Sequence, residues 1–252
     1  MKLHALAWLL LSGLLASGLA AQESSEETRG PDGGTRFRVS GIQVLPAPGK
    51  PFSGQDTIEW TRSLEDGSVV TLRLFAVVAR DSQGRIHRER RTFVPGNSSE
   101  QSKLIETIFL DPIAHTRTTC TVATRDCTVS GYHERATFAP TRAGSLDNGT
   151  RYLTRENLGS SVVEDSNVVG TRETLSIKAG VVGNNQALVS TREFWYSPDL
   201  QVNLSVTRKD PREGTQVIQL VDLSRSEPDP ALFEAPADFS IHDVRSSAEA
   251  GN

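Results

Sequence analysis

Alternation of apolar and polar residues with a period of two is the feature that most constrains the fold of this chain. The clearest example spans residues 201–208. Val202, Leu204 and Val206 fall on one face there, and polar residues fall on the other. This pattern is typical of an antiparallel strand with one face in solvent.

Similar runs recur along the chain, separated by turn signals such as Glu65-Asp66-Gly67. In residues 215–223 we expect Val217, Val221 and Leu223 to share a face, and residues 228–233 can form one helical turn with Pro at its start. The other expected strands are residues 56–62, 69–80, 85–93, 105–110, 116–122, 127–132, 152–157, 171–178 and 188–196.

Consecutive strands joined by short turns, with almost no helical period, predict a mainly β fold with little helix. We expect a single curved antiparallel meander, that is, an incomplete β-barrel, with a β-sandwich as the alternative. Composition agrees with a globular chain, since 37% of the 252 residues are hydrophobic and 23% are charged. The two cysteines are too few for a disulfide scaffold.

The N-terminus indicates export. Lys2 is followed by an apolar stretch and by small residues at Ala20 and Ala21, which is typical of a secretory signal peptide over residues 1–21. The alternative is an uncleaved membrane anchor, for which the apolar run is marginal in length. We therefore expect a periplasmic or extracellular protein with no transmembrane segment after cleavage.

The rest of the chain divides into three expected parts. Residues 22–50 contain Ser, Gly and Pro and are predicted to be a flexible leader, although a short strand can begin near Phe37. Residues 51–245 form a single β domain with a long loop at 134–149, where a true domain boundary is the alternative. Residues 246–252 are predicted to be a disordered tail.

Charge and cysteine spacing restrict the partners. Removing residues 1–21 leaves 26 of the 27 Lys and Arg against 31 Asp and Glu, so the mature chain is acidic and nucleic acid is a poor partner. Cys120 and Cys127 match neither a redox nor a zinc pattern. In an oxidising compartment they favour a disulfide across a hairpin, with free thiols as the alternative.

Several short motifs carry a family resemblance. They are Trp195-Tyr196-Ser197-Pro198-Asp199-Leu200, Asp210-Pro211-Arg212-Glu213-Gly214 and Glu227-Pro228-Asp229-Pro230-Ala231-Leu232-Phe233. With them the chain resembles, over residues 51–241, a family of exported bacterial proteins of unknown activity common in Acidobacteria. More distantly it resembles the LolA/LolB/RseB-like periplasmic superfamily. That second resemblance implies a half-barrel that holds lipid or lipoprotein acyl chains.

Catalytic chemistry has little support in the sequence. The histidines after the signal peptide, His87, His115, His133 and His242, form no metal-binding pair, and no nucleophile elbow or phosphate-binding loop is present. We predict no metal and no cofactor, and an enzyme is the function that the sequence favours least.

The candidate ligand-binding residues are aromatic or basic. Trp195 and Tyr196 stand at a strand end, where they can line a ligand cavity or, alternatively, cap the core. Trp60 is a further scarce aromatic anchor. Arg88 and Arg90 share one strand face with Ile86 and can contact an anionic group such as a phospholipid head group, the alternative being a solvated strand with cross-strand ion pairs.

These observations predict an exported soluble protein that holds an apolar or amphipathic ligand, such as a lipid or a lipoprotein, on a curved sheet. The alternative is an envelope sensor or protein-interaction module without a small ligand, which would use its sheet edges or its aromatic corner.

Overall fold

The computed structural model describes residues 27–29, 36–38, 41–132 and 141–245. The predicted signal peptide, the predicted C-terminal tail, His133 and the first part of the predicted 134–149 loop lie outside the described residues. Within the described part of the chain no helix is long and apolar enough to cross a membrane.

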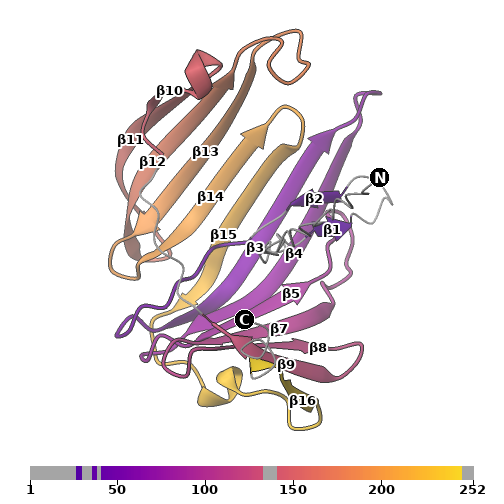
Figure 1. The fold of residues 1–252 in the computed structure, drawn as a ribbon, viewed down its shortest axis with the longest axis vertical. Coiled ribbons are helices and arrows are strands. Elements are labelled where there is room, and N and C mark those ends of the chain that lie inside the picture. The colour runs from indigo at the N-terminus through magenta and orange to yellow at the C-terminus, as the bar shows by residue number, and fades with distance from the viewer. Residues whose placement is uncertain (1–26, 30–35, 39–40, 133–140, 246–252) are drawn as a thin grey trace, which may run out of the picture.

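One 14-stranded sheet dominates the structure (Figure 1). Its first half consists of β3 (Phe52–Ser63), β4 (Val69–Arg80), β5 (Ile86–Arg91), β6 (Val94–Pro95), β7 (Leu104–Asp111), β8 (Thr116–Thr121) and β9 (Asp126–Gly131). Its second half consists of β10 (Gly144–Leu146), β11 (Arg151–Val163), β12 (Ser166–Ile177), β13 (Leu188–Ser197), β14 (Val202–Asp210), β15 (Gly214–Ser224) and β16 (Ser240–Asp243). A separate two-stranded ribbon pairs β1 (Glu27–Arg29) with β2 (Arg36–Arg38).

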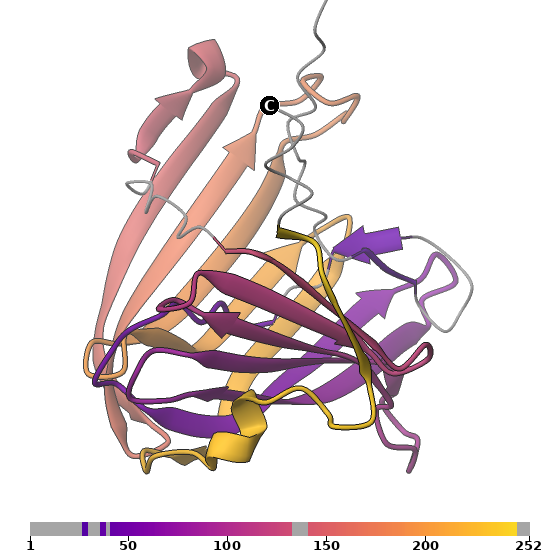
Figure 2. The same cartoon turned by 60° about the horizontal axis from the view of Figure 1, so that its bottom comes forward.

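The helical elements of the described residues are two short 3-10 turns, η1 (Asp147–Gly149) and η2 (Pro230–Phe233). The predicted fold class, a mainly β protein built on one curved antiparallel sheet with little helix, is confirmed (Figures 1 and 2). A β-sandwich is not what forms, because the strands of both halves join one sheet.

The order of the strands adds something that the pattern did not predict. Within each half neighbours in sequence mostly pair, but the halves join through their far ends, since β15 pairs with β3 and Thr215 lies opposite Thr61. The sheet therefore ends at β10 on one side and at β16 on the other. The pairing of β16 with β9 is parallel, whereas the other pairs of this sheet are antiparallel.

The main core lies on one face of the central strands, which we call the inner face. Cross-strand rows on it include Gln216–Trp60–Leu72 and Ile218–Ile58–Leu74. The face predicted for residues 201–208 is confirmed, because Val202, Leu204 and Val206 are buried there.

The buried face of β15 differs from the simplest expectation. Val217 and Val221 share one side of the strand, but Ile218 and Leu220, on the other side, are the fully buried residues. The reason is that Ile218 lies in one cross-strand row with Ile58 and Val206, and Leu220 belongs to the same core cluster, so burying this side removes more apolar surface from water. Leu223 leaves the predicted face, because the register shifts after Val221, and it packs against the main core.

The predicted flexible leader needs correction over its last part. Residues 41–50 lie on the inner face, and Ile42 and Val44 belong to the main core. This segment, the N-terminal strap, forms no strand, and β2 ends before the Phe37–Leu45 strand expected here would reach Leu45. The predicted loop at 134–149 holds β10 and η1 in its described part.

Candidate functional site

The candidate site is the inner face of β3, β4 and β15 together with the N-terminal strap that covers it. Figure 1 shows the strap, in indigo, running across β15 and β14. Ile42 and Val44 pack into the same apolar cluster as Ile58, Trp60 and Leu204. An irregular segment, rather than a sheet or a helix, thus covers apolar strand faces.

Asp56 holds the beginning of the strap. The Ile42 backbone N–H donates to Asp56 Oδ2 over 2.9 Å. The carboxylate is almost fully buried, and its other oxygen, Oδ1, has no hydrogen-bond partner among the described residues. Burial raises the pKa of Asp56 to about 6, although the nearby charge of Arg88 and the Ile42 N–H act in the opposite direction.

Arg80 holds the end of the strap. Its guanidinium is fully buried and donates to backbone carbonyls only: to Leu45 O over 2.9 Å, to Lys50 O over 2.9 Å, and to Leu200 O. It also lies 5.0 Å from the centre of the Phe52 ring. Burial lowers the pKa of Arg80 to about 10, so the side chain remains a cation at neutral pH.

A small cavity of about 30 Å³ lies next to Asp56, where β4 and β5 separate. Only Val78 to Arg80 of β4 pair with β5. Beyond that point, side-chain acceptors replace the backbone pairing between these two strands. The Val77 N–H donates to Glu89 Oε2 and the Phe75 N–H to Ser102 Oγ. The cavity is lined by Gly41, Asp56, Ile58, Leu74, Ala76, Arg88, Glu89, Arg90, Arg91 and Phe93.

A cavity of this size has room for about two water molecules and none for an acyl chain. A larger ligand would enter this cavity only if the side chains or the strap around it moved.

The structure brings three of the five predicted ligand-binding residues to the inner face. Trp60 is buried there, and its indole N–H donates to Glu213 O over 2.7 Å. Arg88 and Arg90 line the cavity beside Asp56. Arg90 also forms an ion pair with Glu106, with 2.7 Å between Nη2 and Oε1.

The other two predicted residues lie in a different place, at the end of β13. Trp195 is half-buried against the main core, and its indole N–H donates to Glu193 Oε1 over 3.0 Å. A Cβ at Gly170 would come within 2.7 Å of the Trp195 ring, so this position suits glycine. Tyr196 is exposed and lies opposite Val169. Trp195 therefore packs against the same core cluster as Trp60, whereas Tyr196 lies outside it.

Asp56 and Arg80 are functional-site residues that the sequence analysis does not identify. The signal for Asp56 was nevertheless present, because a period of two places it on the same side of β3 as Ile58 and Trp60. Arg80 ends a long β-branched run, and the sequence gives no sign of the carbonyls that surround it.

A second covering lies on the opposite, outer face of β5 to β9. Residues 225–244, which we call the C-terminal strap, include η2 and β16. The buried His87 ring contacts Leu232 O through Nδ1 at 2.6 Å, so Nδ1 is the donor, since a carbonyl oxygen only accepts. Phe239 and Ala235 pack on Phe109 and the cystine.

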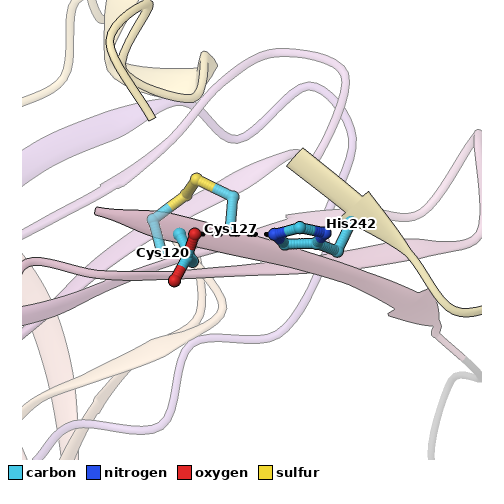
Figure 3. Close-up of a disulfide and its surroundings, with 4 residues drawn as sticks. Cys120, Cys127 and His242 are labelled. Atoms are coloured by element: carbon cyan, nitrogen blue, oxygen red, sulfur yellow. Dashed lines mark ion pairs between the residues drawn. A yellow bond between two sulfur atoms is a disulfide. The ribbon is translucent and has the colours of Figure 1, made fainter. Parts of the chain in front are cut away.

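The predicted disulfide is present under this strap. Cys120 and Cys127 lie directly opposite each other in β8 and β9 and are bonded through their sulfurs. Figure 3 shows the cystine beside His242 of β16. The His242 Nε2 atom lies 3.5 Å from Asp126 Oδ1. No cluster of three or more potential metal ligands occurs among the residues that the structure describes.

Comparison with known proteins gives similarity to solved structures alone. No protein-family model matches the chain, and no curated protein does. The Pseudomonas aeruginosa MucA/MucB complex matches with a TM-score of 0.36 and 14% identity, over 75% of this chain and 57% of that one. A MucB crystal structure matches with a TM-score of 0.34 and 12% identity, over 77% and 60%. The chain thus spans less than two thirds of either matched chain.

A LolA superfamily protein from Nitrosomonas europaea is a further match, with a TM-score of 0.30 and 10% identity, over 75% of this chain and 92% of that one. The predicted LolA-like resemblance thus has counterparts among solved structures, and the acidobacterial family stays a prediction.

Proposed function

We propose that this chain is an exported binding protein that holds an apolar or amphipathic ligand, such as the acyl chain of a lipid or lipoprotein, on the inner face of its sheet. The observation that carries the proposal is the covering of this face by the N-terminal strap. An extended segment without strand pairing can leave an apolar face while the sheet keeps its ladder of hydrogen bonds. The signal-like N-terminus supports export.

Binding is proposed to occur by exchange. The ligand's acyl chain replaces Ile42 and Val44 on the apolar rows around Trp60, so the apolar surface removed from water stays similar. Arg88 and Arg90, at the cavity where the strap begins, then face an anionic head group. Trp195 packs against the same cluster from β13, and Tyr196, which is exposed, lies outside this path.

A fluorescent long-chain fatty acid tests the proposal. With residues 1–21 removed, Trp60 and Trp195 are the two tryptophans of the chain, and energy transfer to the probe reports on both. We expect binding with energy transfer that Trp60→Phe reduces more than Trp195→Phe does. The variant Ile42→Ser/Val44→Ser should bind the probe more tightly, because it weakens the competing strap.

Saturable binding that is insensitive to the Ile42→Ser/Val44→Ser change would place the ligand elsewhere. Absence of binding by this variant, shown by circular dichroism to be folded, would reject a ligand-holding inner face.

A second function is favoured by one observation, the edge strand β11. β10 pairs only with Arg151 to Leu153 of β11, so residues 154–163 lack a strand partner among the described residues on that side. A partner protein can add a strand there. Capture of a partner protein from an envelope extract tests this. Ser160→Pro, on the edge strand, is expected to abolish the capture. Ser190→Pro, on a strand within the sheet, is the comparison that shows the effect of general unfolding.

A further inference from the structure

Exposed apolar side chains gather at one end of β11, β12 and β13. Tyr152, Val181, Val182 and Val189, which we call the apolar tip, are between 38% and 54% exposed. Tyr152 and Val189 both lie opposite Ser176, so they belong to one cross-strand row. Val181 and Val182 lie in the loop that joins β12 to β13, at the top of Figure 1.

The loop that presents the two valines has a defined internal structure. Asn184 accepts from the Val182 N–H through Oδ1 over 3.1 Å and donates through Nδ2 to Lys178 O and Gln186 O. The Gly180 N–H donates to Asn184 O over 2.6 Å. The hydrogen bonds of this loop hold the two valines in water. Their exposure costs about 1 kcal/mol or more of free energy for each side chain, relative to burial.

The charges around the apolar tip are mostly positive. Residues 141–152 and 176–190 hold Arg142, Arg151 and Lys178 against one carboxylate, Asp147. Asp147 forms an ion pair with Arg151, with 3.2 Å between Oδ2 and Nη1. Its charge is thus balanced by Arg151, and Arg142 and Lys178 remain as exposed cations. A basic end on an otherwise acidic mature chain calls for an anionic partner.

The opposite end of the same strands gives a natural contrast. Val162 is 63% exposed there, beside the turn residues Glu164 and Asp165. Residues 160–168 contain no Lys or Arg. Val169 and Tyr196 are also exposed at this end. The two ends therefore differ in charge rather than in apolar exposure, and the upper end is the basic one.

We propose that the apolar tip docks the protein on the surface of an anionic lipid bilayer. Val181 and Val182 insert between head groups, Tyr152 lies at the level of the interface, and Arg142 and Lys178 contact lipid phosphates. Short apolar loops with a neighbouring aromatic ring and basic residues fit this partner, since the apolar atoms leave water while the charges stay with the head groups. Docking of this kind does not depend on a ligand in the inner face.

Vesicle flotation of the chain without residues 1–21 tests the proposal. We expect the protein to float with vesicles of phosphatidylcholine and phosphatidylglycerol, and less with phosphatidylcholine alone or at high salt. The variant Val181→Asp/Val182→Asp should lower the bound fraction about ten-fold. Val162→Asp, at the acidic end, is the matched control and should float like the unchanged protein.

A milder pair of variants guards against misfolding. Val181→Ser/Val182→Ser removes the insertion without adding charge, and Lys178→Glu removes the attraction, so both should weaken flotation while circular dichroism stays unchanged. The proposal is overturned if all variants float equally, or if the unchanged protein does not float. The apolar tip would then be a contact surface for a protein rather than for lipid. Fatty-acid binding in solution is unaffected by either result, so the two proposals fail separately.

Discussion

The two straps cover the two faces of the sheet in different ways. The C-terminal strap adds a strand, β16, whose backbone pairs with β9, and it places Phe239 on the cystine. The N-terminal strap crosses the strands and cannot join their ladder, so buried side chains of the sheet, Asp56 and Arg80, reach its backbone instead. The inner covering therefore depends on a few charged contacts, whereas the outer one is part of the sheet.

The largest effect is expected from Arg80→Met. Three carbonyls would lose their donor inside the protein, which should lower the free energy of unfolding by about 3–5 kcal/mol. Urea denaturation measures this loss, and limited proteolysis should show the N-terminal strap cleaved before the C-terminal one. Arg85→Met, which removes a half-exposed partner of Asp81, is the control and should have a smaller effect.

Asp56→Asn should act with the opposite sign at neutral pH. The pKa of Asp56 is raised from 3.8 to about 6, so the folded state binds a proton more tightly than the unfolded one. Acidification from pH 7.5 to pH 4 therefore stabilises the protein through this group, and the burial of the charge costs up to about 3 kcal/mol above pH 6.

The variant, measured by urea denaturation at several pH values, should be the more stable protein at pH 7.5, with the difference shrinking toward pH 4. An unchanged pH slope would contradict the burial of this carboxylate.

Removing the disulfide tests the outer covering. Cys120→Ser/Cys127→Ser should lower the free energy of unfolding by about 2–3 kcal/mol, since the bond closes a short loop in the unfolded chain. Hydrogen exchange should speed up in β16 more than in residues 41–50. Equal acceleration in both would show that the two coverings are not independent.

His87 gives the smallest expected effect and the sharpest contrast with Asp56. Burial lowers the pKa of His87, and Nε2 is buried without a partner among the described residues. The neutral ring is therefore preferred in the folded state, and stability is lost as the pH falls below about 6.5, where the unfolded state gains protons. Hydrogen exchange near Leu232 should rise on acidification, and His87→Gln should remove that dependence.

Much of the sheet could be predicted because its strands carry local signals. The run from Val69 to Arg80 lies between two turn sequences, and β4 has those same bounds. The far half of β11 was missed because residues 158–161 are Leu, Gly and Ser and show no period, so pairing with β12 rather than propensity makes them a strand.

The candidate site was predicted only in part. Trp60 and Arg88 stand in strand patterns that show which face they occupy. The N-terminal strap was not predicted, because Pro46 and Pro48 resemble a linker and a segment outside the ladder has no period. The contacts of Arg80 come from segments far apart in the chain, and local pattern carries no information about them.

The seam between β15 and β3 has a consequence for how the chain is made. β3 is synthesised early, whereas its partner β15 is synthesised near the end, so one edge of β3 stays unpaired while the strands between them are made. Contacts between residues so distant in sequence slow folding and leave an aggregation-prone intermediate with an unpaired strand edge. A protein with this topology is expected to need a chaperone during the interval before β15 is available.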